Sequence, residues 1–547
     1  MRSEMRIEPV TIKAANKFVQ EYRQNEERAR SYFDFAPFGE EKRRLQDVKQ
    51  RVFKRAPLVR ILKEMNEAWG APKETISQIE RLKDDESVVV IGGQQAGLLT
   101  GPLYSIHKVI SILTYAREQE KRLGVPVVPV FWIAGEDHDF AEINHIFIDR
   151  KGTLEKHTVA QQVYEKKPIS FIKLDKRAVS EWVRTSFLHL PETEHTKEVF
   201  ETINRCLHEA ETYVDFFAKL IFALFPNDGV VLFDSAHENV RKIESDYFIK
   251  LIDAQENIAS SVFETVEKMK RQGFAEPIEV ERDDTHLFYY DGRERILLKR
   301  DGAKWVGKHD EVVFTTEEIK RIAREQPEKL SNNVVTRPIM QELLFPTLAF
   351  IGGDAEIHYW ATLKNCFRAV DPSFTMPLII SRMSYTWVTD RVGKLLQQRA
   401  IDEAEVLGNP FATFKTNWLL SSTSPPIDRL FQEVKENIAM LHEPIRQMAR
   451  SISDDLYQQS ERNLTYIEGA LTDFERKMVQ KVEEKHDVVL MQFQEIENTL
   501  KPFGGLQERI WNPLPFLNEY GLKTFSTMCT NAPFISHEDH HHVVYFS

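Results

Sequence analysis

The stretch VVVIGGQQAGLLTGPLYSIHKVISIL, residues 88–113, decides the fold. It begins with a short continuous apolar run, as a strand buried in a parallel sheet does, and Gly92 and Gly93 end that run. A helix is expected to open around Pro102, and VPVVPVFWIAGEDHD at residues 125–139 supplies the next strand. The order strand, glycine turn, helix, strand predicts a right-handed βαβ unit with parallel strands.

Further apolar runs extend this sheet. They are GVVLFD at residues 229–234, TLAFI at residues 347–351 and MPLII at residues 376–380. Between them, residues 146–172 and 277–315 alternate polar and apolar side chains, which is typical of antiparallel strands. The sequence therefore predicts an α/β core that is interrupted by two insertions.

Residues 427–500 have a different composition, with Glu, Lys, Gln and Asp around a regular apolar seam. The apolar residues recur in alternate steps of four and three, which is the spacing of a coiled coil. Pro444 is expected to kink this element or to start a helix, and two helices are expected to meet near residues 458–463. The seam consists of Val434, Ile438, Leu441, Ile445, Met448 and Ile452, followed by Ile467, Leu471, Phe474 and Met478.

The composition excludes several classes of protein. The 547 residues are too many for one compact core, and the formal net charge of −12 argues against nucleic acid as a partner. The three cysteines, Cys206, Cys366 and Cys529, lie far apart, so neither a disulfide framework nor a structural metal is predicted. No apolar run approaches the roughly 20 residues of a membrane span, so we expect a cytoplasmic protein without a membrane partner.

The first candidate site is the glycine-rich turn at residues 92–97. In an open α/β sheet, ligands bind beyond the carboxyl ends of the strands, and the backbone N–H groups of such a turn favour an anion. A tight turn that needs positive φ is the alternative interpretation, and the turn has neither the GxGxxG spacing nor the GK[ST] ending of known phosphate loops. Lys108 and its neighbour His107 could face either the ligand or the solvent. The substrate-binding candidates here are Gln94, Gln95, Gly97, Thr100, Gly101, Tyr104 and His107.

The second candidate site follows the next strand. Glu136, Asp137, His138 and Asp139 combine carboxylates with an imidazole, which can polarise a nucleophile, bind an ammonium group or ligate a metal. A solvated loop that caps the next helix is the alternative. We expect catalytic residues here because the cluster follows a strand end, beside the Gln/Gly turn. No metal site is predicted, since no zinc-ligand spacing is present.

A third cluster repeats the pattern of a strand, two glycines and a helix. Glu356 follows the turn, and Arg337 upstream is suited to clamp a carboxylate with two hydrogen bonds. Aromatic residues on a helix belong to the core more often than to a ligand platform. The substrate-binding candidates of this cluster are Asn333, Arg337, Gln341, Gly352, Gly353, Glu356 and Tyr359.

These motifs carry a resemblance. GGQQAGLLTGPLY, FWIAGEDHDFAEINH and NVVTRPIMQELLFPTLAFIGGDAEIHYWA are similar to the BshC family, the cysteine-adding enzymes of bacillithiol biosynthesis, and the similarity runs through nearly the whole chain. The resemblance implies a Rossmann-like core with a parallel sheet, inserted connecting-peptide subdomains and a C-terminal α-helical coiled coil that makes a homodimer. The expected segments are 1–145 for the N-terminal helices and first part of the core, 146–225 for the first insertion, 226–265 for the core, 266–330 for the second insertion, 331–385 for the core, 386–503 for the coiled-coil domain and 504–547 for a segment that returns to the core.

The resemblance also implies an activity: a ligase that forms an amide bond between cysteine and glucosaminyl-malate, the last step of bacillithiol biosynthesis. A free carboxylate must be activated before an amine can displace one of its oxygens, so ATP or another nucleotide is a possible cofactor, although the HIGH, KMSKS and Walker signatures are absent. On this reading the acid cluster orients the amine or acts as base, and Arg337 recognises a carboxylate. Two alternatives stay open: a nucleotide- or sugar-dependent transferase, and a coiled-coil scaffold with an inert α/β core.

Overall fold

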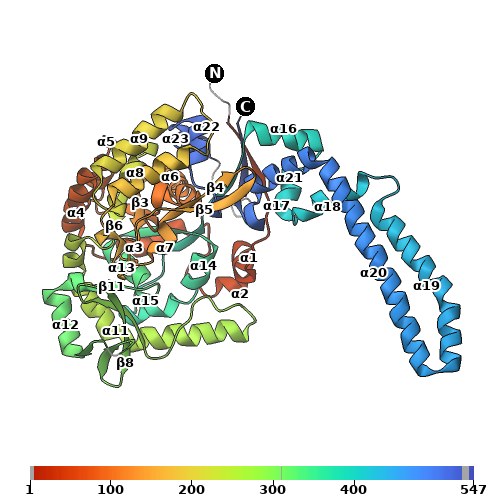
Figure 1. Cartoon of the computed structure of the whole chain (residues 1–547). Coiled ribbons are helices and arrows are strands. Elements are labelled where there is room, and N and C mark those ends of the chain that lie inside the picture. Colours follow the sequence, from red (N-terminus) through yellow and green to blue (C-terminus); the bar gives the residue numbers. More distant parts are fainter. Residues whose placement is uncertain (1–4, 310, 533–540, 547) are drawn as a thin grey trace. The chain divides into compact units, whose positions relative to one another are not determined.

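The structure is a computed structural model that describes residues 5–309, 311–532 and 541–546. The chain divides into two compact units (Figure 1). The larger unit contains Met1–Arg150, Leu154–Trp387 and Gln507–Ser547, and the smaller one contains Lys151–Thr153 and Val388–Leu506. Among the helices of the described residues, none combines the length and the apolar character needed to cross a membrane.

A five-stranded sheet forms the centre of the larger unit, in the order β13-β12-β2-β3-β6, and all its strand pairs are parallel. Numbered by their order along the chain and read from the β6 edge, the five strands follow the Rossmann order 3-2-1-4-5. The direction of this order reverses between β2 and β12. The predicted Rossmann-like core is confirmed. The strands are β2 (Val88–Gln94), β3 (Val127–Ile133), β6 (Val231–Asp234), β12 (Thr347–Gly352) and β13 (Leu378–Ser381).

The helix after β2 starts later than predicted. Helix α6 spans Tyr104–Leu123, whereas the sequence places its start around Pro102. The preceding residues form a short 3₁₀ turn, in which Leu99 and Thr100 have φ values of 49° and 68°, and Gly101 follows with 72°. Residues with positive φ cannot belong to a right-handed helix, so α6 starts only after them.

Other helices surround this sheet. The N-terminal helices α1 (Lys17–Arg23), α2 (Glu27–Arg30), α3 (Glu41–Lys49), α4 (Arg55–Ala68) and α5 (Lys73–Arg81) come before β2, as the sequence predicts. The core is continued by α13 (Thr336–Leu344), α14 (Asp354–Trp360) and α15 (Lys364–Val370).

The first insertion lies between β3 and β6. It starts with the four-residue helix α7 (Phe140–Ile143) and the two-stranded sheet of β4 (His145–Arg150) and β5 (Thr153–Thr158), and then becomes helical. The helices are α8 (Lys176–Phe187), α9 (Thr196–Glu209) and α10 (Tyr213–Leu224).

The second insertion is an antiparallel sheet that follows the long helix α11 (Glu238–Arg271). Its strand order is β10-β9-β8-β7-β11, as expected from the alternating pattern at residues 277–315. The strands are β7 (Asp284–Tyr290), β8 (Arg295–Asp301), β9 (Lys304–Gly307), β10 (Val313–Thr315) and β11 (Leu330–Asn332), and helix α12 (Thr316–Glu325) joins the last two.

Both ends of the described chain join one small sheet. Strand β15 (His541–Phe546) pairs antiparallel with β1 (Met5–Val10), and its other neighbour is β14 (Ser384–Val388). Before β15 come the short helices α22 (Leu514–Tyr520) and α23 (Thr524–Asn531).

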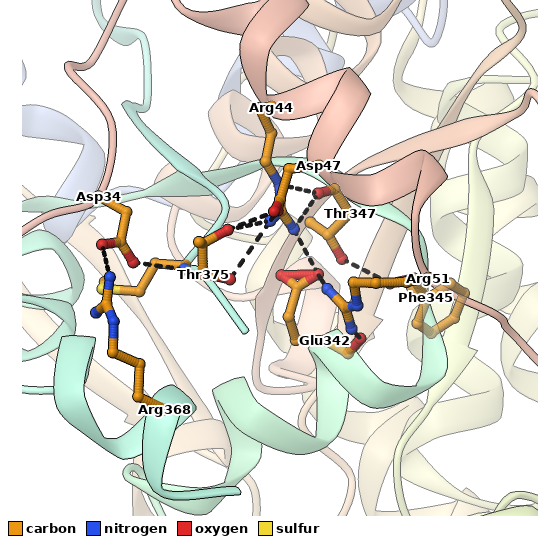
Figure 2. A network of polar contacts seen from close by, with 10 residues as sticks. Asp34, Arg44, Asp47, Arg51, Glu342, Phe345, Thr347, Arg368 and Thr375 are labelled. Carbon is orange, nitrogen blue, oxygen red and sulfur yellow. Dashed lines mark hydrogen bonds and ion pairs between the residues drawn. The ribbon is translucent and has the colours of Figure 1, made fainter. Parts of the chain in front are cut away.

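A buried polar network fixes α13 against the N-terminal helices (Figure 2). Arg44 of α3 and Glu342 of α13 have fully buried side chains, and their ion pair measures 2.6 Å. The same guanidinium donates to the carbonyl oxygen of Thr347 at the start of β12, and Arg51 donates a second hydrogen bond to Glu342. Because a buried charge is costly without partners, this network holds α13 and β12 in one arrangement.

Two long antiparallel helices dominate the smaller unit, α19 (Ile427–Ile452) and α20 (Asp454–Lys485), and they confirm the predicted coiled coil (Figure 1). The ion pair between Lys435 and Glu475 measures 2.8 Å, and the one between Arg446 and Glu461 measures 2.9 Å. The prediction that the helices meet near residues 458–463 is wrong. They meet at Ser453, whose hydroxyl accepts the Leu456 N–H and so caps α20. The other helices of the unit are α16 (Asp390–Arg399), α17 (Glu403–Gly408), α18 (Ala412–Ser421) and α21 (Asp487–Leu500).

The apolar seam of α19 does not lie entirely between the two helices. Leu441 is 77% exposed, and Ile445, Met448 and Ile452 are 58%, 64% and 65% exposed. Pro444 lies within the helix and does not end it. The seam therefore leaves an apolar stripe on the surface of the smaller unit, defined by Leu441, Ile445, Met448 and Ile452.

Candidate active site

The prediction that Gly92 and Gly93 end the first strand is wrong, because both pair with β3 and β2 runs on to Gln94. Gly352 is likewise the last residue of β12. The two glycine-containing segments, which we call the glycine turns, lie at the carboxyl ends of β2 and β12, where the strand order reverses. A Cβ on Gly92 would come within 2.8 Å of the Ile351 carbonyl oxygen, and one on Gly93 within 2.3 Å of the Trp132 carbonyl oxygen. Only glycine fits at this close approach of three neighbouring strands. In a Rossmann-type sheet this reversal is where ligands bind, and we call the region the switch-point site.

Lys108 connects the two turns. Its fully buried ammonium donates to the carbonyl oxygen of Gly93 at 2.7 Å and to the carboxylate of Glu356. Glu356 in turn accepts the Gly353 N–H at 2.8 Å. Burial lowers the pKa of Lys108 to about 8, while the carboxylate of Glu356 raises it. Lys108 therefore does not face solvent. It contacts both glycine turns, directly through Gly93 and through Glu356 at Gly353, and so fixes the spacing between them.

Arg337 places a positive charge beside this site. Its guanidinium donates to the Tyr359 hydroxyl at 2.5 Å and to the Gln341 side-chain oxygen at 3.4 Å. It also lies 5.5 Å from the ring centroid of Phe350. Both hydrogen-bond partners are neutral, because burial raises the pKa of Tyr359 to about 12. An arginine held by neutral partners keeps its charge available for a carboxylate or a phosphate.

Two of the candidates around Arg337 have structural tasks. The side-chain oxygen of Asn333 accepts the N–H groups of Val335 and Thr336, and this caps α13. Gln341 is fully buried and orients Arg337. Arg337 and Tyr359 are thus brought to the switch-point site, whereas Asn333 and Gln341 support them.

The acid cluster is joined to the first glycine turn by Gln95. Its side-chain amide nitrogen donates to Asp137 at 2.5 Å and to Glu142 at 2.6 Å. Asp137 also accepts the His138 N–H at 2.7 Å, and its side chain is 32% exposed. The structure therefore brings Gln95 and Asp137 together, as the prediction of one shared site requires.

Glu136 takes a different place from its neighbours. Its carboxylate is buried and accepts hydrogen bonds from Arg241 at 2.5 Å and from the Asn332 N–H at 3.3 Å. Arg241 also pairs with buried Glu244 at 2.7 Å. The sequence groups Glu136 with the catalytic residues, but both partners bind its Oε2 and Arg241 pairs with its charge in a buried place, so the structure gives Glu136 a supporting role.

His138 lies against Arg295, which comes from the second insertion. The guanidinium of Arg295 is 3.4 Å from Nδ1 of His138 and stacks on Phe288 at 3.8 Å. Burial lowers the pKa of His138, and the charge of Arg295 lowers it further. Since arginine only donates, Nδ1 accepts and the imidazole is neutral with its proton on Nε2. Asp139 is exposed and accepts the Ala141 N–H, which caps α7.

The acid cluster is held in place by a glycine. A Cβ on Gly135 would come within 2.1 Å of Asp234 and 2.0 Å of the Ser170 hydroxyl oxygen. That hydroxyl donates to both carboxylate oxygens of Asp234 at 2.8 Å. Gly135 therefore lets the loop pass closely over the end of β6.

His107 lies behind the site. Its Nδ1 is 2.6 Å from the carboxylate of Glu508, and its Nε2 accepts from the indole of Trp387 at 3.1 Å. Glu508 also accepts from the Arg382 guanidinium at 2.6 and 2.7 Å, and the Arg382 backbone N–H donates to Gly352. The sequence groups His107 with the substrate-binding residues. The structure instead places it in a fully buried chain of contacts that ends at the second glycine turn.

The other candidates of the first loop act through the backbone or the site wall. A Cβ on Gly97 would come within 2.7 Å of the Gly101 Cα, so these glycines pack on each other. Thr100 is buried beside them. Gln94 ends β2, where its carbonyl oxygen accepts the Ala134 N–H. Tyr104 starts α6, and its pKa is raised chiefly by burial and also by nearby Glu142 and Glu356.

The thiols and the possible metal ligands lie elsewhere. Cys206, Cys366 and Cys529 are buried, and burial raises the pKa of each thiol. Such thiols are poor nucleophiles. In the described part of the chain, the group of acidic side chains that is close enough to hold a metal ion is Glu281, Asp283 and Asp284, around the start of β7.

Comparisons with known proteins agree with this architecture. The family description "Bacillithiol biosynthesis BshC, N-terminal Rossmann-like domain" matches residues 5–383, and its C-terminal coiled-coil domain matches residues 385–546. A protein of Oceanobacillus iheyensis named "Putative cysteine ligase BshC" is 38% identical over 539 residues, which cover 98% of this chain and 99% of that protein. Proteins of the same name from a Geobacillus species and Bacillus cereus are 39% and 38% identical, covering 88% and 96% of this chain and 88% and 97% of those proteins. The chain therefore belongs to the BshC family.

Proposed function

We propose that this chain is a ligase that forms an amide bond between the carboxyl group of cysteine and the amine of glucosaminyl-malate, the last step of bacillithiol biosynthesis. The observation that carries this proposal is that the carboxyl ends of the central strands hold one cationic and one anionic side chain, neither of which is neutralised by an ion pair with the other. The guanidinium of Arg337 has neutral partners, and the carboxylate of Asp137 lies beside Gln95 of the first glycine turn. The name of the relatives, "Putative cysteine ligase BshC", supports the coarser part of this proposal, a ligase that acts on cysteine.

The roles of the residues follow from their chemistry. In our proposal Asp137 binds the ammonium group of the acceptor and removes its proton, so that the nitrogen lone pair attacks the carboxyl carbon of cysteine. Asp137 holds this first proton. As the C–N bond forms, the nitrogen loses its second proton to solvent, the C–O bond to the activated carboxyl oxygen breaks, and that oxygen leaves with the phosphate-containing group of the activator. Arg337 binds an anionic group, such as the malate carboxylate, by two parallel hydrogen bonds. None of the cysteine residues of the chain takes part.

The carboxyl group of cysteine needs an activator. A nucleoside triphosphate supplies this by turning a carboxyl oxygen into a leaving group. The positive charge of Arg337 suits an anionic ligand, whereas the charge of Lys108 is paired with Glu356. The turn at residues 92–97 has no GK[ST] ending.

The test uses the purified full chain with cysteine, glucosaminyl-malate and ATP. Mass spectrometry is expected to find a product with one added cysteinyl residue, together with AMP or ADP. The nature of the released nucleotide identifies the bond that activates cysteine. Transfer from a nucleotide sugar instead of amide formation would establish the transferase alternative, and the absence of product with every nucleoside triphosphate tested would contradict the proposal.

We also propose that two copies of the chain associate through the coiled coil. The apolar stripe of α19 has the spacing of a coiled-coil seam, and its four members are more than half exposed in the single chain. A second copy with the same stripe would cover it. The substrates of the proposed reaction are small molecules, so the coiled coil acts as an assembly element.

A further inference from the structure

A polar cavity adjoins the acid cluster, with His138 and Asp139 in its lining. It has a volume of about 600 Å³. One wall is formed by residues 138–144 and the other by residues 158–166, all within the larger unit. The volume is within the range of pockets that hold small molecules, about 300–1,000 Å³.

The cavity has a fixed frame. The two walls are tied together by the backbone hydrogen bond from Val159 to Asn144, which measures 2.9 Å. The side-chain oxygen of Gln161 accepts from the Tyr213 hydroxyl and the Asp175 N–H, each at 2.8 Å, and its amide donates to a backbone carbonyl at 2.8 Å. Gln161 thus uses its hydrogen bonds to fix the wall of the cavity.

The lining combines the groups that recognise a sugar. Its carboxylates are Asp139 and Glu165, and Lys166 contributes an ammonium group, so these three side chains carry a net charge of −1. Tyr164 is 86% exposed, and its hydroxyl donates to the side-chain oxygen of Gln162, which orients the ring. An exposed aromatic ring offers a flat apolar surface to the C–H face of a pyranose, while amides and carboxylates bind hydroxyl groups in defined directions.

We propose that this cavity binds the pyranose ring of a glycoside acceptor, with Tyr164 stacked on one face of the ring. His138 belongs to the cavity wall, and its Nδ1 lies 3.8 Å from a carboxylate oxygen of Asp137. An amino group on a ring seated in the cavity can therefore approach Asp137. The inference rests on the proposed function for this last step, whereas the binding of the sugar itself does not depend on it.

The test measures binding of methyl α-glucosaminide to the full chain by saturation-transfer NMR and by titration calorimetry. The Tyr164→Ala variant is expected to raise the dissociation constant roughly five- to tenfold, which is the effect of losing one stacked ring. Tyr164→Phe keeps the ring and is expected to bind within about twofold of the wild type. The matched control is Tyr466→Ala, which removes a tyrosine of α20 that is 78% exposed.

Two outcomes would overturn the inference: the wild-type chain does not bind the glycoside, or Tyr164→Ala binds it as tightly as Tyr466→Ala does. A failure of the proposed function is seen separately, in the amide-forming assay. If the glycoside binds in a Tyr164-dependent manner but no amide is formed, the cavity assignment holds and the ligase proposal fails. If amide formation proceeds with unchanged KM for the acceptor in Tyr164→Ala, the ligase proposal holds and the cavity assignment fails.

Discussion

Lys108 of α6 and Glu356 in the first turn of α14 form an ion pair, and the lysine side chain has no exposed surface. The two residues are 248 positions apart in the chain. Through Gly93 on one side and Gly353 on the other, this pair joins the backbones of both glycine turns. The geometry of the switch-point site therefore depends on one buried charge.

Lys108→Met tests this dependence. Methionine fills a similar volume but leaves Glu356 and the Gly93 carbonyl oxygen without their donor. We expect the free energy of unfolding to fall by about 3 kcal/mol and amide formation to be largely lost. Urea unfolding and the mass-spectrometric assay measure the two effects. Lys121→Met, at the exposed end of the same helix, serves as the control and should change neither. A fully active Lys108→Met protein would show that the turns do not need this link.

The lowered pKa of Lys108 predicts a pH dependence of stability. Burial lowers this pKa from the ordinary 10.5 to about 8. Between pH 8 and 10.5 the unfolded chain binds the Lys108 proton and the folded chain has released it, so this group makes the free energy of unfolding rise with pH. Methionine does not titrate. The unfolding free energy of the wild type minus that of Lys108→Met should therefore increase as the pH rises from 8 to 10.5. A constant difference in urea melts from pH 8 to 10.5 would contradict the shift.

The sequence predicts the parts of the site that depend on neighbouring residues. The apolar runs that start at Val88 and Val125 are local signals, and the structure has strands β2 and β3 at these places, although β2 continues through Gly92 and Gly93 to Gln94. Helix α6 shows the limit of such signals. Its start depends on the backbone angles of Leu99 and Thr100, which result from packing around the turn rather than from their side-chain types.

The supporting charges could not be predicted in the same way. His107 meets Glu508 from 401 positions away, and Glu136 meets Arg241 from 105 positions away. A sequence pattern shows that these residues are polar, but not whether a partner buries them. For Lys108 the sequence left both a ligand-facing and a solvent-facing position open, and the structure shows neither, because its ammonium group is buried against Glu356. This partner is set by the strand order of the folded sheet.

Arg337→Ala is predicted to weaken binding of the anionic substrate. The loss of charge-assisted hydrogen bonds costs about 2 kcal/mol, which corresponds to roughly a thirtyfold rise in KM. Arg337→Lys keeps the charge but not the two parallel donors, and we expect an intermediate KM. Steady-state kinetics with varied glucosaminyl-malate measure both variants. An unchanged KM in Arg337→Ala would remove this residue from the substrate site.

Asp137→Asn tests the proposed base. The amide cannot take a proton from the acceptor, so kcat should fall by about 10²–10⁴. The fold should be retained, because the asparagine oxygen still accepts the His138 N–H and the Gln95 amide can rotate to offer its oxygen. Glu142→Gln alters the other carboxylate that contacts Gln95 and is expected to stay within about threefold of the wild type. Equal losses in the two variants would mean that both act only by orienting Gln95.

Gln95→Ala and His138→Ala test the link between the first glycine turn and the acid cluster. In Gln95→Ala the amide that donates to both Asp137 and Glu142 is lost. The two carboxylates then repel each other without a shared donor between them. We expect both variants to lose product formation while their thermal unfolding stays cooperative. Full activity in the purified double variant would separate these residues from the catalytic site.

The apolar stripe of α19 predicts the assembly state. In Leu441→Glu/Met448→Glu, the introduced carboxylates stand at positions that are 77% and 64% exposed in the single chain, so they should leave each chain folded. If a second copy covers the stripe, burying these charges is costly and the dimer should dissociate. Sedimentation equilibrium is expected to give one chain mass for this variant and two for the wild type. Asn437→Glu/Gln447→Glu places the same charges outside the stripe on the same helix and should remain dimeric. A wild-type protein that sediments as one chain, or a stripe variant that still sediments as two, would contradict this assembly.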